Sequence, residues 1–176
     1  NDCVTRLSGI NLYPLARGRT CFSRDELAEA LEQVSETGKA GDSIGAVMIE
    51  SPVRNQRGQI VRYEEMKAIT DLCRSRGISS HLDGARLYMM SAATGIAPRE
   101  YAALFDTVYV SMYKYFGATY GAILAGTSEF IKDMHQDRRM FGGSLASSYL
   151  AAALALKGVE GFEERFGAAM AKASEL

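Results

Sequence analysis

Short apolar runs alternate with longer segments of helical periodicity along this chain, and this alternation constrains its fold more than any other feature. The apolar runs predict strands at residues 44–49, 78–82, 107–112 and 121–125. Helical spacing predicts helices at residues 24–36, 63–76, 98–105, 128–139 and 147–156. Strands that alternate with helices of this length indicate an α/β fold, with a mainly parallel sheet flanked by helices.

Local signals mark several of the predicted helix ends. Ser23 and Glu26 have the spacing of a capping box at the start of the first predicted helix. Gly77 follows the second predicted helix, where glycine is a common C-terminal cap. Ser128 is expected to cap the helix that follows it. These signals support the helix assignments independently of the apolar spacing.

Two side chains of opposite charge follow neighbouring predicted strands. Asp83 directly follows the strand at 78–82, and Lys114 follows the strand at 107–112. In parallel α/β sheets the carboxyl ends of the strands lie at one edge, and ligands collect there. We therefore expect Asp83 and Lys114 to lie at the same edge of the sheet.

The chemistry of these residue types is compatible with an aldehyde cofactor. A lysine amine condenses with an aldehyde to form a Schiff base. Pyridoxal phosphate supplies such an aldehyde, and its ring stabilises a carbanion at the Cα of an amino acid. The carboxylate of Asp83 suits a protonated ring nitrogen, and the guanidinium of Arg86 suits the phenolic oxygen or a carboxylate. Taken singly, an Asp-Gly turn or a lysine after a strand is more often structural, so the pattern alone leaves both explanations open.

Composition excludes several classes of function. The 176 residues include 20 basic and 21 acidic side chains, and the formal net charge of −1 argues against a nucleic-acid partner. No apolar run is long enough to span a bilayer. No metal site is expected, because there are only two histidines and the three cysteines lack the spacing of metal ligands. Scattered cysteines, odd in number, are typical of a cytoplasmic protein.

Two longer motifs resemble those of a known enzyme family. The segment His81-Leu-Asp-Gly-Ala-Arg-Leu87 resembles the hallmark of the threonine aldolase and β-eliminating lyase family of fold-type I pyridoxal-phosphate enzymes. Residues 103–114 and 117–126 resemble the segment that carries the cofactor lysine in that family. The resemblance runs from about Leu7 to the end of the chain.

The resemblance implies a fold, a cofactor and three residue roles. The fold would be part of the large domain of an aspartate-aminotransferase-like, fold-type I enzyme, and the cofactor would be pyridoxal 5′-phosphate. Lys114 would be the catalytic residue that bonds to the cofactor aldehyde. Asp83 would pair with the pyridine nitrogen, and Arg86 would reach the phenolic oxygen.

The same resemblance implies an activity and a molecular setting. The expected reaction is a lyase cleavage of a β-hydroxy amino acid between Cα and Cβ, which gives glycine and an aldehyde, or a related β-elimination. The substrate is then a small amino acid, and the protein is a homodimer or homotetramer without a nucleic-acid or membrane partner. Residues 1–176 are expected to be a partial cofactor-binding large domain, which lacks its N-terminal segment and its C-terminal small domain. Such a fragment alone would be weakly active or inactive.

Three places depart from the family pattern. Glycine often follows the family's lysine, whereas this chain has Tyr115 and then Phe116. Threonine aldolases often carry a histidine in the loop that here begins Ser51-Pro-Val-Arg54 after Glu50. Residues 142–147 lack the arginine and glutamine that many members carry just after their glycines. The missing histidine concerns the choice of substrate more than the cofactor, and the bulkier residue after the lysine would change the shape of the pocket near it.

Alternative functions are consistent with the same pattern. An aminotransferase or a racemase shares the fold, and a truncated, non-catalytic copy would keep the same motifs. A dinucleotide-binding domain is disfavoured because the chain has no Gly-x-Gly-x-x-Gly turn. His81 either touches the cofactor, holds Asp83 in orientation, or is a core histidine with its own partner. Ser111 either meets a phosphate or has no functional role.

Overall fold

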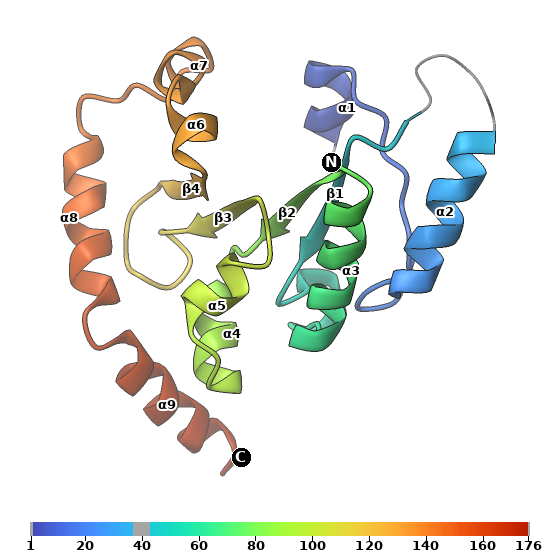
Figure 1. The fold of residues 1–176 in the computed structure, drawn as a ribbon. Helices are drawn as coiled ribbons and strands as arrows, with labels where there is room; N and C mark the ends of the chain where they lie inside the picture. The colour runs from blue at the N-terminus through green and yellow to red at the C-terminus, as the bar shows by residue number, and fades with distance from the viewer. Residues whose placement is uncertain (1, 37–42, 176) are drawn as a thin grey trace.

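A four-stranded sheet forms the centre of the fold (Figure 1). The computed structural model describes residues 2–36 and 43–175. The sheet has the order β1-β2-β3-β4, and its strands are β1 Ala46–Glu50, β2 Ser79–Asp83, β3 Thr107–Ser111 and β4 Ala122–Gly126. β1, β2 and β3 are parallel, whereas β4 runs antiparallel to β3. The predicted α/β fold with a mainly parallel sheet is confirmed.

Helices connect and flank the strands. Within the described ranges they are α1 Asp2–Ser8, α2 Arg24–Glu36, the 3₁₀ helix η1 Arg54–Gln56, α3 Tyr63–Ser75, α4 Leu87–Thr94, α5 Pro98–Ala102, α6 Ser128–Ile131, α7 Met134–Met140, α8 Ser148–Val159 and α9 Phe162–Ala173. The first two predicted helices agree with α2 and α3, except that α3 ends one residue early. Helix α9 begins after Gly161, whose φ of 63° lies in the left-handed region.

The apolar pattern does not predict α4, which follows β2 after a tight turn. Its sequence is apolar on most faces, so no polar stripe reveals a helical period. Leu87 and Met90 are buried, and Tyr88 and Met89 are half-buried. The start of this helix fixes Arg86 as its N-cap residue.

Helix capping confirms one local prediction and corrects another. The main-chain N–H of Ser23 donates to the Glu26 carboxylate at 2.8 Å, and the Glu26 N–H donates to the Ser23 hydroxyl at 3.2 Å, so the capping box is present. The prediction that Ser128 is a cap is wrong. Thr127 is the N-cap, and its hydroxyl accepts a hydrogen bond from the Phe130 N–H at 3.2 Å. Both residue types cap helices well, so the sequence alone does not distinguish two adjacent hydroxyls.

The helix predicted at 128–139 is in fact two helices, α6 and α7. Asp133, just before α7, has φ −105° and ψ 1°, outside the helical range. Side chains with good helical spacing on both sides of the break conceal it in the sequence. By contrast, Gly77 has φ 66° and ends α3 as predicted.

The core lies on one face of the sheet. Alternate side chains along β1, β2 and β3 are buried, as the two-residue period of a strand requires. The buried strand residues and the helix residues packed with them include Val47, Ile49, Leu82, Val108, Val110, Leu27, Met66, Ile69, Met90 and Tyr101. The opposite face is partly open, because Met48 in the middle of β1 is 53% exposed.

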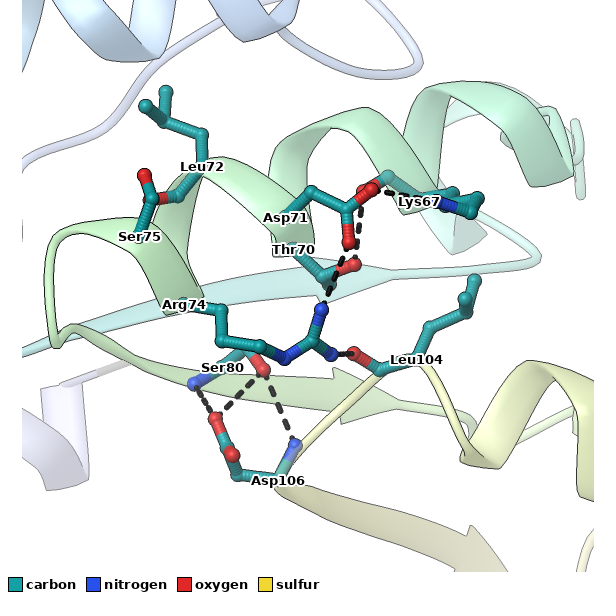
Figure 2. Close-up of polar contacts among 9 residues, drawn as sticks. All are labelled: Lys67, Thr70, Asp71, Leu72, Arg74, Ser75, Ser80, Leu104 and Asp106. Atoms are coloured by element: carbon teal, nitrogen blue, oxygen red, sulfur yellow. Dashed lines mark hydrogen bonds and ion pairs between the residues drawn. The ribbon is translucent and has the colours of Figure 1, made fainter.

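Ser80 and Asp106 join the amino ends of β2 and β3 (Figure 2). The Asp106 carboxylate accepts hydrogen bonds from the Ser80 N–H at 2.7 Å and from the Ser80 hydroxyl at 2.8 Å. Beside this pair, Arg74 of α3 donates to the Asp71 carboxylate at 2.8 Å and to the Leu104 carbonyl at 3.5 Å. These bonds fix how β2 lies against β3, and therefore where the residues that follow the two strands lie.

The residues that the structure describes contain neither a candidate membrane span nor a candidate metal site. None of their helices has the length and apolarity that crossing a bilayer demands. None of their His, Cys, Asp and Glu side chains forms a group of three or more that could hold a metal ion. Cys21 and Cys73 are free thiols.

Candidate active site

Polar side chains line the edge where β1, β2 and β3 end. Glu50 pairs with Asp83 across β1 and β2, and Asp83 pairs with Tyr109 across β2 and β3. Residues that are paired in register on neighbouring strands share a face of the sheet. Glu50, Asp83 and Tyr109 therefore form a row on the partly open face, the face that carries Met48.

Asp83 is the last residue of β2 and is half-buried. Its Oδ1 accepts a hydrogen bond from the Ala85 N–H at 3.1 Å. In the part of the chain that the structure describes, Oδ2 has no hydrogen-bond partner. The Asp83 carbonyl also accepts from the Ser51 N–H at 3.2 Å, which ties the end of β2 to the loop after β1. The carboxylate is thus oriented by its own turn and keeps one oxygen for a ligand.

Gly84 lets the chain turn sharply from β2 into α4. A Cβ at this position would lie 3.0 Å from the carbonyl oxygen of Tyr109 and 3.2 Å from the Cβ of Leu87. These contacts are tight, and a main-chain carbonyl in a sheet cannot move away freely. The close approach of the β2–α4 turn to β3 therefore requires glycine after Asp83.

Lys114 lies in the turn that follows β3. The strand ends at Ser111, one residue earlier than predicted, so the lysine follows it by three residues. Lys114 is exposed, and its Nζ lies 5.6 Å from the centroid of the Tyr113 ring, within the range of a cation–π contact. Among the residues described, Lys114 has no carboxylate partner.

Arg86 is half-buried at the N-cap of α4. Within residues 2–36 and 43–175, its guanidinium makes no hydrogen bond and no ion pair. The topology brings Asp83, Arg86 and Lys114 to one edge of the sheet, yet none of the three neutralises another. Unpaired charges gathered in this way are typical of a site that binds a charged ligand.

His81 has a partner inside the fold. Its Nδ1 lies 2.8 Å from the hydroxyl of Thr107 on β3. Burial lowers the pKa of His81 below its ordinary value, and the opposing effect of the nearby Asp83 charge is smaller. These contacts favour a core histidine that bridges β2 and β3.

Ser111 and the neighbouring tyrosines are likewise engaged. Ser111 is fully buried, and its hydroxyl lies 3.0 Å from the hydroxyl of Tyr109. The hydroxyl of Tyr120 lies 3.3 Å from that of Ser147. Ser111 therefore already has a polar partner, which makes a phosphate-binding role for it less favourable.

Aromatic rings pack behind the turn that carries Lys114. The ring centroid of Phe116 lies 5.0 Å from that of Tyr88 on α4 and 5.2 Å from that of Phe162 on α9. The Tyr115 ring lies 4.4 Å from Phe116 and 5.2 Å from Phe162. The two residues after the lysine are thus anchored by side chains from α4 and α9.

The hydroxyl of Tyr115 is buried and has no hydrogen-bond partner in the described part of the chain. Burial raises the pKa of Tyr115 to about 12, although the Tyr88 N–H and the charge of Arg86 act in the opposite direction. The hydroxyl therefore lies buried without a well-aligned hydrogen bond in the described part of the chain. A buried hydroxyl left in this way costs stability unless a ligand satisfies it.

Two hollows border this region without enclosing Lys114. A hollow of about 410 Å³ lies between the loop before β4 and α8, and its lining residues are Thr119, Tyr120, Ser147, Leu150, Ala153 and Leu154. A second hollow of about 170 Å³ is lined in part by Glu50, Met48, Cys21 and Arg19. Glu50, a member of the polar row, therefore borders the second hollow.

Comparison with known families identifies the family of this chain. The family model described as beta-eliminating lyase matches residues 3–176. This chain belongs to the beta-eliminating lyase family.

Relatives in this family include a low-specificity L-threonine aldolase of Candida albicans, which is 36% identical over 103 residues, 58% of this chain and 28% of the relative. An alanine racemase of Cochliobolus carbonum is 30% identical over 162 residues, 92% of this chain and 40% of the relative. A Listeria monocytogenes structure, provisionally described as an L-allo-threonine aldolase, has 34% identity and a TM-score of 0.78 over 94% of this chain and 43% of its own. The chain thus spans less than half the length of these relatives. The likeness in structure confirms the fold-type I architecture.

Sequence reasoning missed three residues of this region, one at the edge of the sheet and two that pack against Phe116. Glu50 ends a parallel strand just as Asp83 does, so the same rule about carboxyl ends would have found it. The rings of Tyr88 and Phe162 contact each other although their helices are far apart in the chain, and no local sequence pattern indicates such a contact.

Proposed function

We propose that this member of the beta-eliminating lyase family is a pyridoxal-phosphate-dependent lyase that cleaves a β-hydroxy amino acid between Cα and Cβ. The products are glycine and an aldehyde, and a related β-elimination is the nearest alternative. The observation that carries the proposal is the set of unpaired charges on Asp83, Arg86 and Lys114 at one edge of the sheet. The threonine aldolase of Candida albicans among the relatives supports this type of reaction.

The groups at this edge fit pyridoxal phosphate. Lys114 offers an exposed primary amine for covalent attachment. Asp83 offers a half-buried carboxylate with one free oxygen, which suits a protonated ring nitrogen. Arg86 offers a planar donor for an anionic oxygen. Each of these groups lacks, in the described chain, the partner that the cofactor would provide.

The mechanism follows from what these residues do around the cofactor. When bound, pyridoxal phosphate supplies an aldehyde for a lysine amine and a ring that withdraws electrons from the substrate Cα. Asp83 holds a proton at the ring nitrogen, while the Ala85 N–H keeps its carboxylate oriented. Arg86 donates to an anionic oxygen and stabilises its charge. Lys114 would hold the cofactor through its aldehyde, and its amine, when not attached, would carry a proton.

The setting of the enzyme belongs to the same proposal. Residues 1–176 form part of a cofactor-binding large domain, and the enzyme is a cytoplasmic homodimer or homotetramer that acts on a small amino acid. Exposed apolar side chains on α8 support a further protein contact; they include Tyr149, Leu150, Leu154 and Leu156.

A racemase is the second candidate function. The alanine racemase of Cochliobolus carbonum aligns with 92% of this chain, a larger share than the Candida aldolase covers. A racemase breaks the Cα–H bond and releases no aldehyde, whereas an aldolase breaks Cα–Cβ. Product analysis therefore separates the two.

The cofactor is tested by an absorbance titration with pyridoxal phosphate, followed by borohydride reduction and peptide mapping. The wild type is expected to give a visible band and a reduced cofactor on Lys114, and Lys114→Ala is expected to give neither. Lys132→Ala is the matched control, because Lys132 is also exposed and lacks an ion pair among the residues described. Equal trapping in wild type and Lys114→Ala would overturn the assignment of the lysine.

The reaction is tested on a panel of β-hydroxy amino acids and on L-alanine. Glycine and an aldehyde in equal amounts indicate aldol cleavage, a 2-oxo acid and ammonia in equal amounts indicate β-elimination, and D-alanine indicates racemisation. A protein that traps the cofactor on Lys114 but forms none of these products would contradict the proposed activity while leaving the cofactor site intact.

A further inference from the structure

Helix α8 presses directly on the turn that carries Lys114. A Cβ on Gly158, near the end of α8, would lie 1.7 Å from the carbonyl oxygen of Phe116 and 2.7 Å from its Cα. These atoms are main chain and cannot move aside as a flexible side chain does. The contact therefore exists only because residue 158 is glycine, and it occurs two residues after the lysine.

The corner between α8 and α9 holds Gly158 in place. Arg165 of α9 donates to the Gly158 carbonyl at 2.5 Å and also to the Glu160 carbonyl. Gly161 makes the turn between the two helices in a left-handed conformation, with φ 63°. Figure 1 shows α8 and α9, coloured orange to red, running in succession along the side of the molecule that carries β4. The end of α8 is thus tied to α9, not left as a free terminus.

The α8–α9 corner also contacts the side chain of Phe116. Phe162, the first residue of α9, is 7% exposed and meets the Phe116 ring edge-on at 5.2 Å. Tyr88 of α4 meets Phe116 from another side at 5.0 Å and Phe162 at 6.2 Å. Phe116 is therefore held by main-chain contact with α8 and by ring contacts with α9 and α4.

We propose that Gly158 and Phe162 are positioning residues for Lys114. The α8–α9 corner holds Phe116 in place, and Phe116 holds the main chain of the turn that carries Lys114. Without these contacts the turn, and with it the lysine amine, would adopt many orientations. The same contacts tie the lysine turn to α4, whose N-cap is Arg86, so the two cationic residues keep a constant relation. This inference rests on the proposed role of Lys114 as the cofactor lysine.

The test compares Gly158→Ala with Gly167→Ala. Gly167 lies within α9, where a Cβ would meet no atom within 4 Å, so it is a matched control for a helical glycine. Acetylation of Lys114 by acetic anhydride, measured by mass spectrometry over a range of pH, needs no cofactor. Lys67 is the internal reference, because it pairs with Asp71 on α3.

In folded Gly158→Ala, the Lys114/Lys67 acetylation ratio is expected to change by about threefold or more, with an altered pH profile, because small displacements have large effects on reactivity. Trapped pyridoxal phosphate is expected to shift from Lys114 toward other lysines. Gly167→Ala is expected to match the wild type in both readouts. A folded Gly158→Ala protein with the wild-type ratio and profile would overturn the proposal.

A second pair of variants covers the case in which Gly158→Ala does not fold. Phe162→Leu keeps an apolar side chain but loses the ring contact with Phe116, whereas Phe166→Leu removes a ring that stacks on Phe162 at 5.6 Å. Only Phe162→Leu is expected to change the acetylation of Lys114, and equal profiles for both variants would overturn the proposal. If the wild type traps no cofactor at all, the proposed function fails, while acetylation still decides whether the corner positions the lysine.

Discussion

The ring of Tyr88 meets the ring of Phe116 edge-on, with centroids 5.0 Å apart and planes at 84°. Tyr88 follows Arg86 by two residues, and Phe116 follows Lys114 by two residues. This ring contact therefore joins the β2–α4 turn to the turn after β3. The charged residues of the candidate site therefore lie on two turns that pack against each other through these rings.

Gly84→Ala adds only one methyl group, yet it is expected to displace the turn that carries Asp83 and Arg86. The added methyl would meet the Tyr109 carbonyl at 3.0 Å, so the turn that carries Asp83 and Arg86 must shift. We expect a loss of about 1–3 kcal/mol in the free energy of unfolding and weaker trapping of pyridoxal phosphate. Gly45→Ala is the control, since a Cβ there meets nothing within 4 Å. Equal denaturation midpoints for the two variants would contradict this account.

Tyr115→Phe is expected to leave the protein equally stable or to stabilise it by about 1 kcal/mol, because it removes a buried hydroxyl without a partner. Tyr101→Phe is the matched control. The hydroxyl of the buried Tyr101 donates to the Thr94 hydroxyl at 3.1 Å in a partly buried hydrogen bond, so its loss should cost about 1 kcal/mol. Chemical denaturation measures both changes. A clear destabilisation by Tyr115→Phe would mean that the Tyr115 hydroxyl has a partner in solution.

Asp106 is expected to stabilise the fold in a way that depends on pH. The Ser80 N–H, and then the Ser80 hydroxyl, lower the pKa of Asp106 below its ordinary value of 3.8. The stabilisation is therefore fully present above 3.8 and is lost as the pH falls through the lower, folded-state pKa.

Asp106→Asn should cost about 1 kcal/mol at neutral pH, since the residue is exposed and the bonds to Ser80 weaken without the charge. The difference in stability between Asp106→Asn and the wild type, measured by thermal unfolding, should become smaller in acid. Glu32→Gln, at an exposed site on α2, is the control. It should change neither the stability at neutral pH nor the way stability depends on pH. A difference that stays constant down to strongly acidic pH would count against the role of the charge.

His81 is expected to weaken the fold as the pH falls. Burial lowers its pKa below the ordinary 6.5, so the unfolded chain binds the proton more readily than the folded chain. Stability is therefore full above about 6.5 and declines below it. His81→Gln should flatten this decline in melting temperature between about pH 8 and about pH 5, whereas His135→Gln, at an exposed site on α7, should not. An unchanged decline in His81→Gln would exclude His81 as its source.

Local sequence signals predicted much of the fold. The apolar spacing located α2, α3 and the strands, and the rule about carboxyl ends placed Asp83 and Lys114 at one edge before any coordinates. These predictions succeed because periodicity and capping act within a few residues of chain. They fail where two adjacent residues offer the same chemistry, as Thr127 and Ser128 do, or where a helix such as α4 is apolar on most faces.

The sequence by itself determined which charged residues come after which strands, because a short stretch of sequence is enough to indicate a strand and the side chains that follow it. Only the tertiary structure decided that Glu50, Asp83 and Tyr109 form one row, and that the Gly158 backbone lies against Phe116. These contacts join elements far apart in the chain. Their energies come from shape and close packing, which no local pattern of polar and apolar residues encodes.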